Sequence, residues 1–176
     1  MKINKILDGT VKSYKEVDYY VPITIYYREN NEKYQELFYY RAKNKRSSFI
    51  EVTISSSTKK IVRIIVVSIN DIVETDGSIE RITSLLGKTG NPEMDMNLFE
   101  NEGIITDEID FKIVRHDKRI YVLYDVEKIN KKLIMENCEI LLDDDNILGY
   151  IFSGFTKEEW IEINESIDSS TKKRRC

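Results

Sequence analysis

The chain has 176 residues, of which 41% are hydrophobic and 33% charged, and its formal net charge is −4. This composition can fill one core and is too balanced for a disordered chain, so we expect a single domain over residues 1–170 and a basic flexible tail over residues 171–176. No segment approaches the ~20 apolar residues of a membrane span, the N-terminus lacks a signal-peptide pattern, and two cysteines exclude a disulfide framework. The sequence therefore predicts a cytoplasmic protein.

The first third of the chain favours β-structure. Residues 1–18 carry a weak apolar pattern that leaves helix and strand both open. Residues 19–28 alternate in polarity, and Pro22 near their start has no N–H to donate, which predicts an edge strand or a strand start. A polar turn over residues 29–32 then leads to a second predicted strand over residues 37–43.

Residues 49–70, FIEVTISSSTKKIVRIIVVSIN, predict the hairpin at the centre of the fold. Its first strand alternates strictly, so we expect it nearer an edge of the sheet. Its second strand is almost continuously aliphatic, which favours a central strand covered on both faces. Because short polar loops join consecutive strands, residues 19–70 are expected to form a four-stranded antiparallel meander.

The middle of the chain is less regular. Ser78 is a candidate N-cap for a short helix over residues 79–86, and Gly87 is well placed to end it. Residues 88–103 show no clean period, which is typical of a loop or of an element that the pattern does not reveal.

The last third returns to hairpins. Strands are predicted over residues 111–115 and 119–124, and again over 138–142 and 147–152. Apolar spacing over residues 126–133 suggests a short helix between the two hairpins.

A C-terminal helix has the clearest signal. Thr156 and Glu159 form the pattern of a capping box, and Phe155 and Trp160 that of a hydrophobic staple. The predicted fold class is α+β: an antiparallel sheet of about six to eight strands built from hairpins, with two or three short helices including this capped one.

No catalytic, cofactor-binding or metal-binding residue is predicted. The Gly-Lys-Thr at 87–89 resembles the end of a phosphate loop, but Ile82 occupies the position of the required first glycine. His116 is the only histidine, Cys138 alternates with buried strand residues, and the acidic turn at 143–146 lacks the glycine and glutamate of a calcium loop. The acidic body also argues against direct nucleic-acid binding by the basic residues 41–46.

The most informative chemistry lies between Lys88 and Lys112, where there are seven acidic residues and no basic one. Acidic groups with adaptable apolar anchors suit docking on a basic protein surface. The alternative is a solvated loop whose apolar residues pack back on the sheet. The candidate partner-binding residues are Glu93, Asp95, Phe99, Glu100, Glu102, Asp107, Glu108 and Asp110.

Two segments carry a family resemblance. One is the hairpin at residues 49–70 with its Glu-Val-Thr-Ile strand, and the other is ILLDDDNILGYIFSGFTKEEWIEI at residues 140–163. The chain resembles small immunity proteins of bacterial polymorphic toxin systems, including contact-dependent growth inhibition. The resemblance implies a cytosolic protein that binds and neutralises a toxin domain, often a nuclease, without catalysis, and it transfers no site residue.

The leading hypothesis is therefore an immunity protein that covers the active site of a basic cognate toxin with an acidic surface, with no membrane partner and an oligomeric state left open. One alternative is a small cytosolic hydrolase that uses carboxylates brought together by the fold. Another is an adaptor domain of mobile-element origin. A deep pocket lined by paired carboxylates would favour the hydrolase, and a flat or protruding acidic face would favour the inhibitor.

Overall fold

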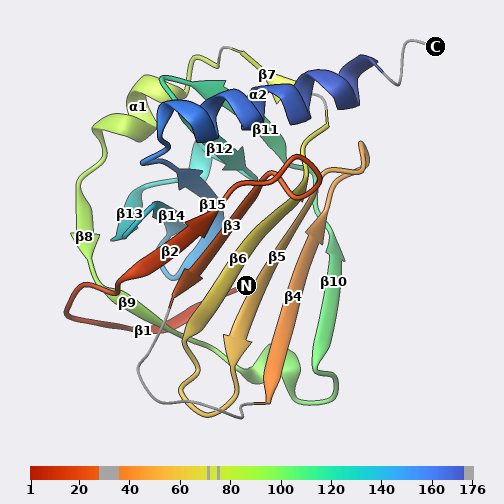
Figure 1. The fold of residues 1–176 in the computed structure, drawn as a ribbon. Helices are drawn as coiled ribbons and strands as arrows, with labels where there is room; N and C mark the ends of the chain where they lie inside the picture. Colours follow the sequence, from red (N-terminus) through yellow and green to blue (C-terminus); the bar gives the residue numbers. More distant parts are fainter. Residues whose placement is uncertain (28–35, 71, 75, 173–176) are drawn as a thin grey trace.

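The chain forms two large β-sheets that pack face to face, as the computed structural model in Figure 1 shows. The structure describes residues 1–27, 36–70, 72–74 and 76–172, with side chains up to residue 168. The six-stranded sheet has the order β10 (Ile104–Glu108), β4 (Leu37–Lys43), β5 (Phe49–Ser55), β6 (Ile61–Ser68), β3 (Ile23–Tyr27) and β2 (Ser13–Glu16). The seven-stranded sheet has the order β7 (Ile72–Val73), β11 (Lys112–His116), β12 (Arg119–Leu123), β15 (Asn146–Phe152), β14 (Cys138–Asp143), β13 (Lys131–Met135) and β8 (Gly87–Thr89).

Shorter elements complete the fold. Strands β1 (Ile3–Leu7) and β9 (Asn91–Met94) pair at one end of the two sheets, and helix α2 (Lys157–Lys172) lies across the other end (Figure 1). The remaining described helical elements are α1 (Ile79–Ser84) and the 3-10 turns Asn97–Phe99 and Val126–Lys128. In the described part of the chain, no helix has the length and apolar character to cross a membrane.

The predicted α+β class is confirmed. One antiparallel sheet of six to eight strands was expected, whereas the described chain forms a six-stranded and a seven-stranded sheet, and both are mixed and not purely antiparallel. β10 pairs with β4, β7 with β11 and β8 with β13, all in parallel. All three parallel pairs join strands that are far apart in sequence. Hairpin signals predict only antiparallel pairs of consecutive strands, so these edge strands lay beyond the reach of the sequence pattern.

The predicted meander is wrong in one connection. β3 lies beside β6 and not beside β4, with Ile25 opposite Ile64. The inward residues of β6 are fully buried, and the strand obtains a neighbour on both edges only because β3 pairs with it. Strand β5, which was expected nearer an edge, lies in the interior of the sheet between β4 and β6. The turn predicted at residues 29–32 lies outside the described residues.

The two faces of the six-stranded sheet differ. Its inner face packs on the seven-stranded sheet, where Val52 and Ile64 share a core with Val122 and Ile140. The seven-stranded sheet is covered on its other face as well, because α1 buries its apolar residues against it. Among the described residues, no helix or further sheet covers the outer face of the six-stranded sheet (Figure 1). The expectation that β6 is covered on both faces is therefore wrong, since Ile65 remains partly exposed.

The middle of the chain departs most from its predicted elements. Helix α1 ends at Ser84, earlier than expected, and Gly87 begins strand β8 in place of a helix end. The predicted helix over residues 126–133 is a 3-10 turn followed by β13, in which Leu133 is a buried strand residue. Apolar spacing alone did not separate a short helix from a turn and a strand.

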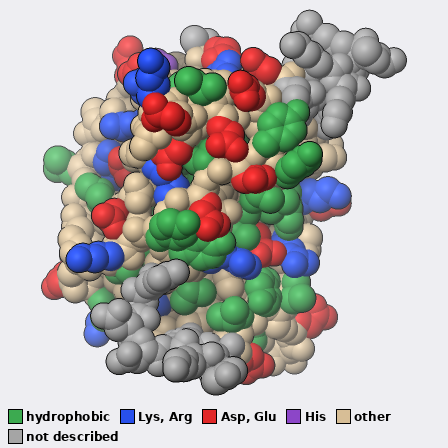
Figure 2. All heavy atoms as spheres, viewed as in Figure 1, with side chains coloured by type: hydrophobic (Ala, Val, Ile, Leu, Met, Phe, Trp, Pro, Cys, Tyr) green, Lys and Arg blue, Asp and Glu red, His purple; other side chains and the backbone are tan. Residues whose placement is uncertain are grey.

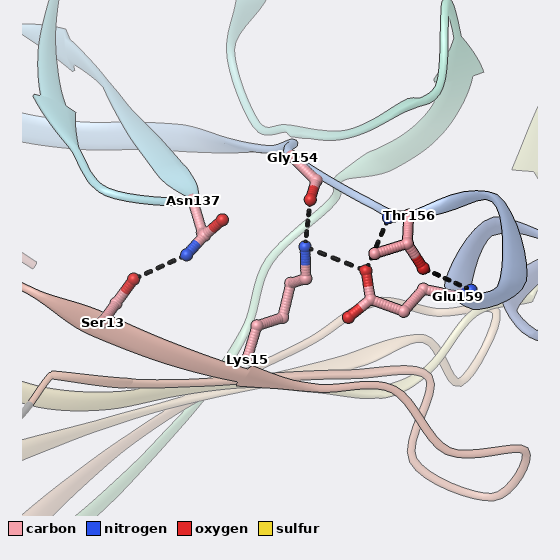
Figure 3. Close-up of polar contacts among 6 residues, drawn as sticks. All are labelled: Ser13, Lys15, Asn137, Gly154, Thr156 and Glu159. Atoms are coloured by element: carbon pink, nitrogen blue, oxygen red, sulfur yellow. Dashed lines mark hydrogen bonds and ion pairs between the residues drawn. The ribbon is translucent and has the colours of Figure 1, made fainter.

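The cap of α2 is confirmed (Figure 3). The Glu159 carboxylate accepts a hydrogen bond from the Thr156 N–H at 2.7 Å, and the Thr156 hydroxyl accepts one from the Glu159 N–H at 3.2 Å. The rings of Phe155 and Trp160 lie 5.8 Å apart, as the hydrophobic staple requires. Such caps are each worth about 1 kcal/mol, and here they fix where the helix leaves β15.

Strand β2 is fastened to this cap. The Lys15 ammonium donates to the Gly154 carbonyl oxygen and lies 3.2 Å from the Glu159 carboxylate, as Figure 3 shows. Asn137, in the turn between β13 and β14, donates to the Ser13 hydroxyl at 2.7 Å. These contacts tie one edge strand of the six-stranded sheet to the other sheet and to α2.

Candidate protein-binding surface

The acidic segment between Lys88 and Lys112, for which a loop and an unrevealed element were both left open, is folded. It forms β9, the 3-10 turn Asn97–Phe99 and β10, and so runs along one end of the two sheets and then up the edge of the six-stranded sheet (Figure 1). Three of the predicted partner-binding carboxylates are occupied by local hydrogen bonds. Glu93 accepts from the Asn4 amide at 3.3 Å, Asp95 from the Asn97 N–H at 3.0 Å, and Asp107 from the Tyr40 hydroxyl at 2.8 Å.

The other predicted acids are free to contact solvent. They lie before, within and just after β10, so they form a negative border along this edge of the sheet. We name them the acidic edge, and they are Glu100, Glu102, Glu108 and Asp110. Strand pairing places Lys43 of β4 opposite Glu108, which offsets part of this charge at one end.

Phe99 differs from the other predicted contacts. Its side chain is only 5% exposed and its ring stacks on Phe38, with the centroids 5.2 Å apart. In this position the ring holds the acidic segment against the sheet. The exposed apolar groups nearby are Leu98 and Ile104, which are 43% and 47% exposed.

The outer face of the six-stranded sheet carries two continuous rows of side chains that the sequence reasoning missed. Each row crosses all six strands, because the pairing register sets one residue of every strand beside the next. The first row, from β2 to β10, is Tyr14, Tyr26, Arg63, Thr53, Tyr39 and Ile104. The second is Glu16, Thr24, Ile65, Glu51, Arg41 and Thr106.

At the centre of these rows, Glu51 lies between two arginines. Its carboxylate oxygens are 2.9 Å from the Arg41 Nε and 3.2 Å from an Arg63 terminal nitrogen, and its side chain is 9% exposed. Arg63 also donates to the Thr53 hydroxyl at 3.3 Å. Hydrogen bonds to ionised groups are stronger than neutral ones, so this trio holds both arginines in place on the sheet.

A second carboxylate orders the tyrosine end of the rows. Glu16 accepts hydrogen bonds from the Tyr14 hydroxyl at 2.9 Å and the Tyr26 hydroxyl at 3.1 Å. The two rings stack with centroids 5.8 Å apart. Partial burial raises the pKa of Tyr26, and the hydrogen bond to Glu16 raises it further. The phenol therefore stays neutral and remains a donor. The face thus presents large aromatic groups that are already fixed in position.

Figure 2 shows hydrophobic side chains gathered on this face among acidic and basic ones. Tyrosine and arginine are enriched at protein–protein interfaces, because they supply large contact areas together with polar groups. No signal within one strand reveals such a surface. The tyrosines lie on β2, β3 and β4, and only the register of the sheet brings them into line. One sequence signal could have indicated this surface. The outward positions of several strands carry Tyr, Arg or Ile, whereas a solvent-exposed sheet face usually carries polar residues.

The residues considered for catalysis lie elsewhere. His116, at the tip of the β11–β12 hairpin, is exposed and lies 3.3 Å from Asp117, at the border of two surface cavities. Of the carboxylates that line them, Glu74 accepts a hydrogen bond from the Arg115 Nε at 3.1 Å. Cys138 is buried, which raises the pKa of its thiol far above the usual range. Within the described ranges, no group of three or more metal-ligating side chains is placed to hold an ion.

Comparison with known proteins yields no family assignment. No family model matches the sequence, and no curated protein matches it either.

Proposed function

We propose that this protein inhibits a basic protein, in the manner of an immunity protein that binds and neutralises a toxin domain in the cytoplasm. The observation that carries the proposal is the outer face of the six-stranded sheet, which no described helix or strand covers. The seven-stranded sheet is covered on both faces. The outer face of the six-stranded sheet instead leaves Ile65 and Ile104 partly exposed beside fixed tyrosines and arginines. Contact with water does not favour exposed apolar side chains. A partner that covers the face would explain why these side chains are there.

The charge of the acidic edge supports a basic partner. Complementary charge accelerates association and selects the partner, while buried aromatic and aliphatic contacts slow dissociation. A nuclease suits this arrangement, because a cleft that binds phosphates is itself basic. A surface that fills such a cleft excludes its substrate without any chemistry of its own.

A direct experiment uses the product of the gene adjacent to that of this protein. If that product arrests growth when expressed, co-expression of this protein should restore growth, and the two purified proteins should bind each other. Failure of the pair to bind would overturn the proposal.

Matched charge reversals locate the contact. Glu100→Lys with Glu108→Lys reverses two charges of the acidic edge, while Glu127→Lys with Glu165→Lys makes the same change in net charge at exposed positions outside it. The first variant should bind about tenfold or more weakly, and the second should bind like the wild type. Equal effects of the two variants would show that net charge, and not this edge, controls binding.

A further inference from the structure

The two large sheets have four outer edges, and these are not equivalent. β7 has two residues and β8 has three, so neither offers a long ladder. β2 is fastened by the turn between β13 and β14, since the Ser13 N–H donates to the Glu136 carboxylate. β10 is a five-residue strand that lies at the margin of its sheet with no described strand beyond it (Figure 1).

The backbone of β10 uses only one of its two sides. The Gly103 carbonyl accepts from the Tyr39 N–H at 2.9 Å, and the Ile109 N–H donates to the Lys43 carbonyl at 3.0 Å. In a strand, the N–H and C=O of one residue point to the same side, and that side alternates along the chain. The odd-numbered residues from Gly103 to Ile109 therefore face β4. The even-numbered residues Ile104, Thr106 and Glu108 direct their N–H and C=O groups to the open side.

We propose that β10 is a docking strand, to which an extended segment of the basic partner adds as a seventh strand of the sheet. This inference rests on the proposed function and names how the partner is held. An open row of donors and acceptors is a template for another strand, and main-chain hydrogen bonds give such a complex its register. The negative charge of the acidic edge favours a basic segment as the added strand.

The side chains of β10 specify the added segment. The outward residues of the added segment would lie beside Ile104, Thr106 and Glu108. They would extend the two rows of the outer face by one position. Cross-strand pairs favour an apolar or aromatic residue next to Ile104 and a lysine or arginine next to Glu108. A second copy of this chain is a poor occupant, because it would bring a second acidic edge close to the first.

The first test uses the N–H of Thr106, which points to the open side of β10. Thr106→Pro removes a donor on the open side and adds a ring there, but it removes no hydrogen bond to β4. Residue 105 is already extended, as the residue before a proline prefers. Thr106→Ala removes the same side chain and keeps the N–H. Binding of the purified adjacent-gene product should weaken about tenfold or more in Thr106→Pro and stay within about threefold in Thr106→Ala.

A second measurement does not depend on any variant folding. Hydrogen exchange at the wild-type amides of Ile104, Thr106 and Glu108 should slow on binding, while the β4-facing amides of Ile105 and Asp107 should change less. Normal binding by a folded Thr106→Pro, or unchanged exchange at the three open amides, would overturn strand addition. In that case loss of binding by the Glu100/Glu108 reversal would still support the proposed function. A wild-type protein that does not bind the adjacent-gene product overturns both.

Discussion

Ile64 and Ile65 are neighbours in β6, yet their side chains leave the sheet on opposite faces. Ile64 is fully buried between the two sheets, whereas Ile65 lies partly exposed on the outer face, between Thr24 and Glu51. The same aliphatic chemistry therefore has two environments in consecutive residues. One belongs to the core, and the other belongs to the proposed protein-binding surface.

Ile64→Asp should unfold the protein. The substitution places an unpaired carboxylate between the two sheets, at a cost of at least several kcal/mol, which is comparable to the whole stability of a domain of this size. Circular dichroism and urea denaturation measure the result. A cooperatively folded variant near wild-type stability would show that the space around residue 64 is not the dry core described above.

Ile65→Thr should have the opposite profile. Threonine keeps a β-branched side chain in a position that water already reaches, so the free energy of unfolding should fall by no more than about 1 kcal/mol. Binding to the partner should weaken by roughly five- to tenfold, because apolar contact on the outer face is lost. Titration calorimetry with the adjacent-gene product measures the change. Unaltered affinity would remove this part of the face from the interface.

The local elements were predictable because their signals lie within a few residues. The hairpin joining β14 and β15 and the cap of α2 depend on turn chemistry and on a four-residue motif, and both are present. The aliphatic run of β6 was different. Ile and Val occur both on a face buried in the core and on a face that binds a partner. The sequence of a strand with one exposed face therefore resembles that of a strand covered on both faces.

Long-range pairing and the candidate site were less accessible. β10 lies beside β4 although more than fifty residues separate them, and no turn motif encodes a parallel neighbour. The acidic run was visible in the sequence, but its division into occupied and exposed carboxylates depends on partners such as Tyr40 and Asn4. The aromatic row is a property of register alone, since Tyr14, Tyr26 and Tyr39 come from three separate strands.

Glu51→Gln should destabilise the protein by about 1–3 kcal/mol. The amide keeps the shape of the carboxylate, but it leaves Arg41 and Arg63 facing each other with no negative charge between them. Arg41→Gln should cost less, because Glu51 retains Arg63. Urea denaturation of the two single variants and the double variant forms a cycle. A coupling energy below about 0.5 kcal/mol would show that the trio adds nothing beyond its separate parts.

The Asp76–Lys112 pair should make stability depend on pH below 4. Partial burial opposes the charged form of Asp76, but hydrogen bonds from Lys112 and Ser78 outweigh it and lower its pKa from 3.8 to about 2. A folded-state pKa below the unfolded one means that the ionised carboxylate stabilises the fold. The contribution, roughly 2 kcal/mol, is complete above the unfolded pKa near pH 4 and is lost as pH falls through about 2.

Asp76→Asn should remove this part of the pH dependence. The wild type should lose stability relative to the variant between about pH 4 and pH 2, and the difference between them should be largest near neutral pH. Asp8→Asn is the matched control, because Asp8 also pairs with a lysine, Lys88, at 2.9 Å, but both side chains are mostly exposed. Exposed pairs contribute little, since water and salt screen them, so this variant should follow the wild-type profile. Identical acid profiles for wild type and Asp76→Asn would mean that burial of Asp76 cancels what Lys112 supplies.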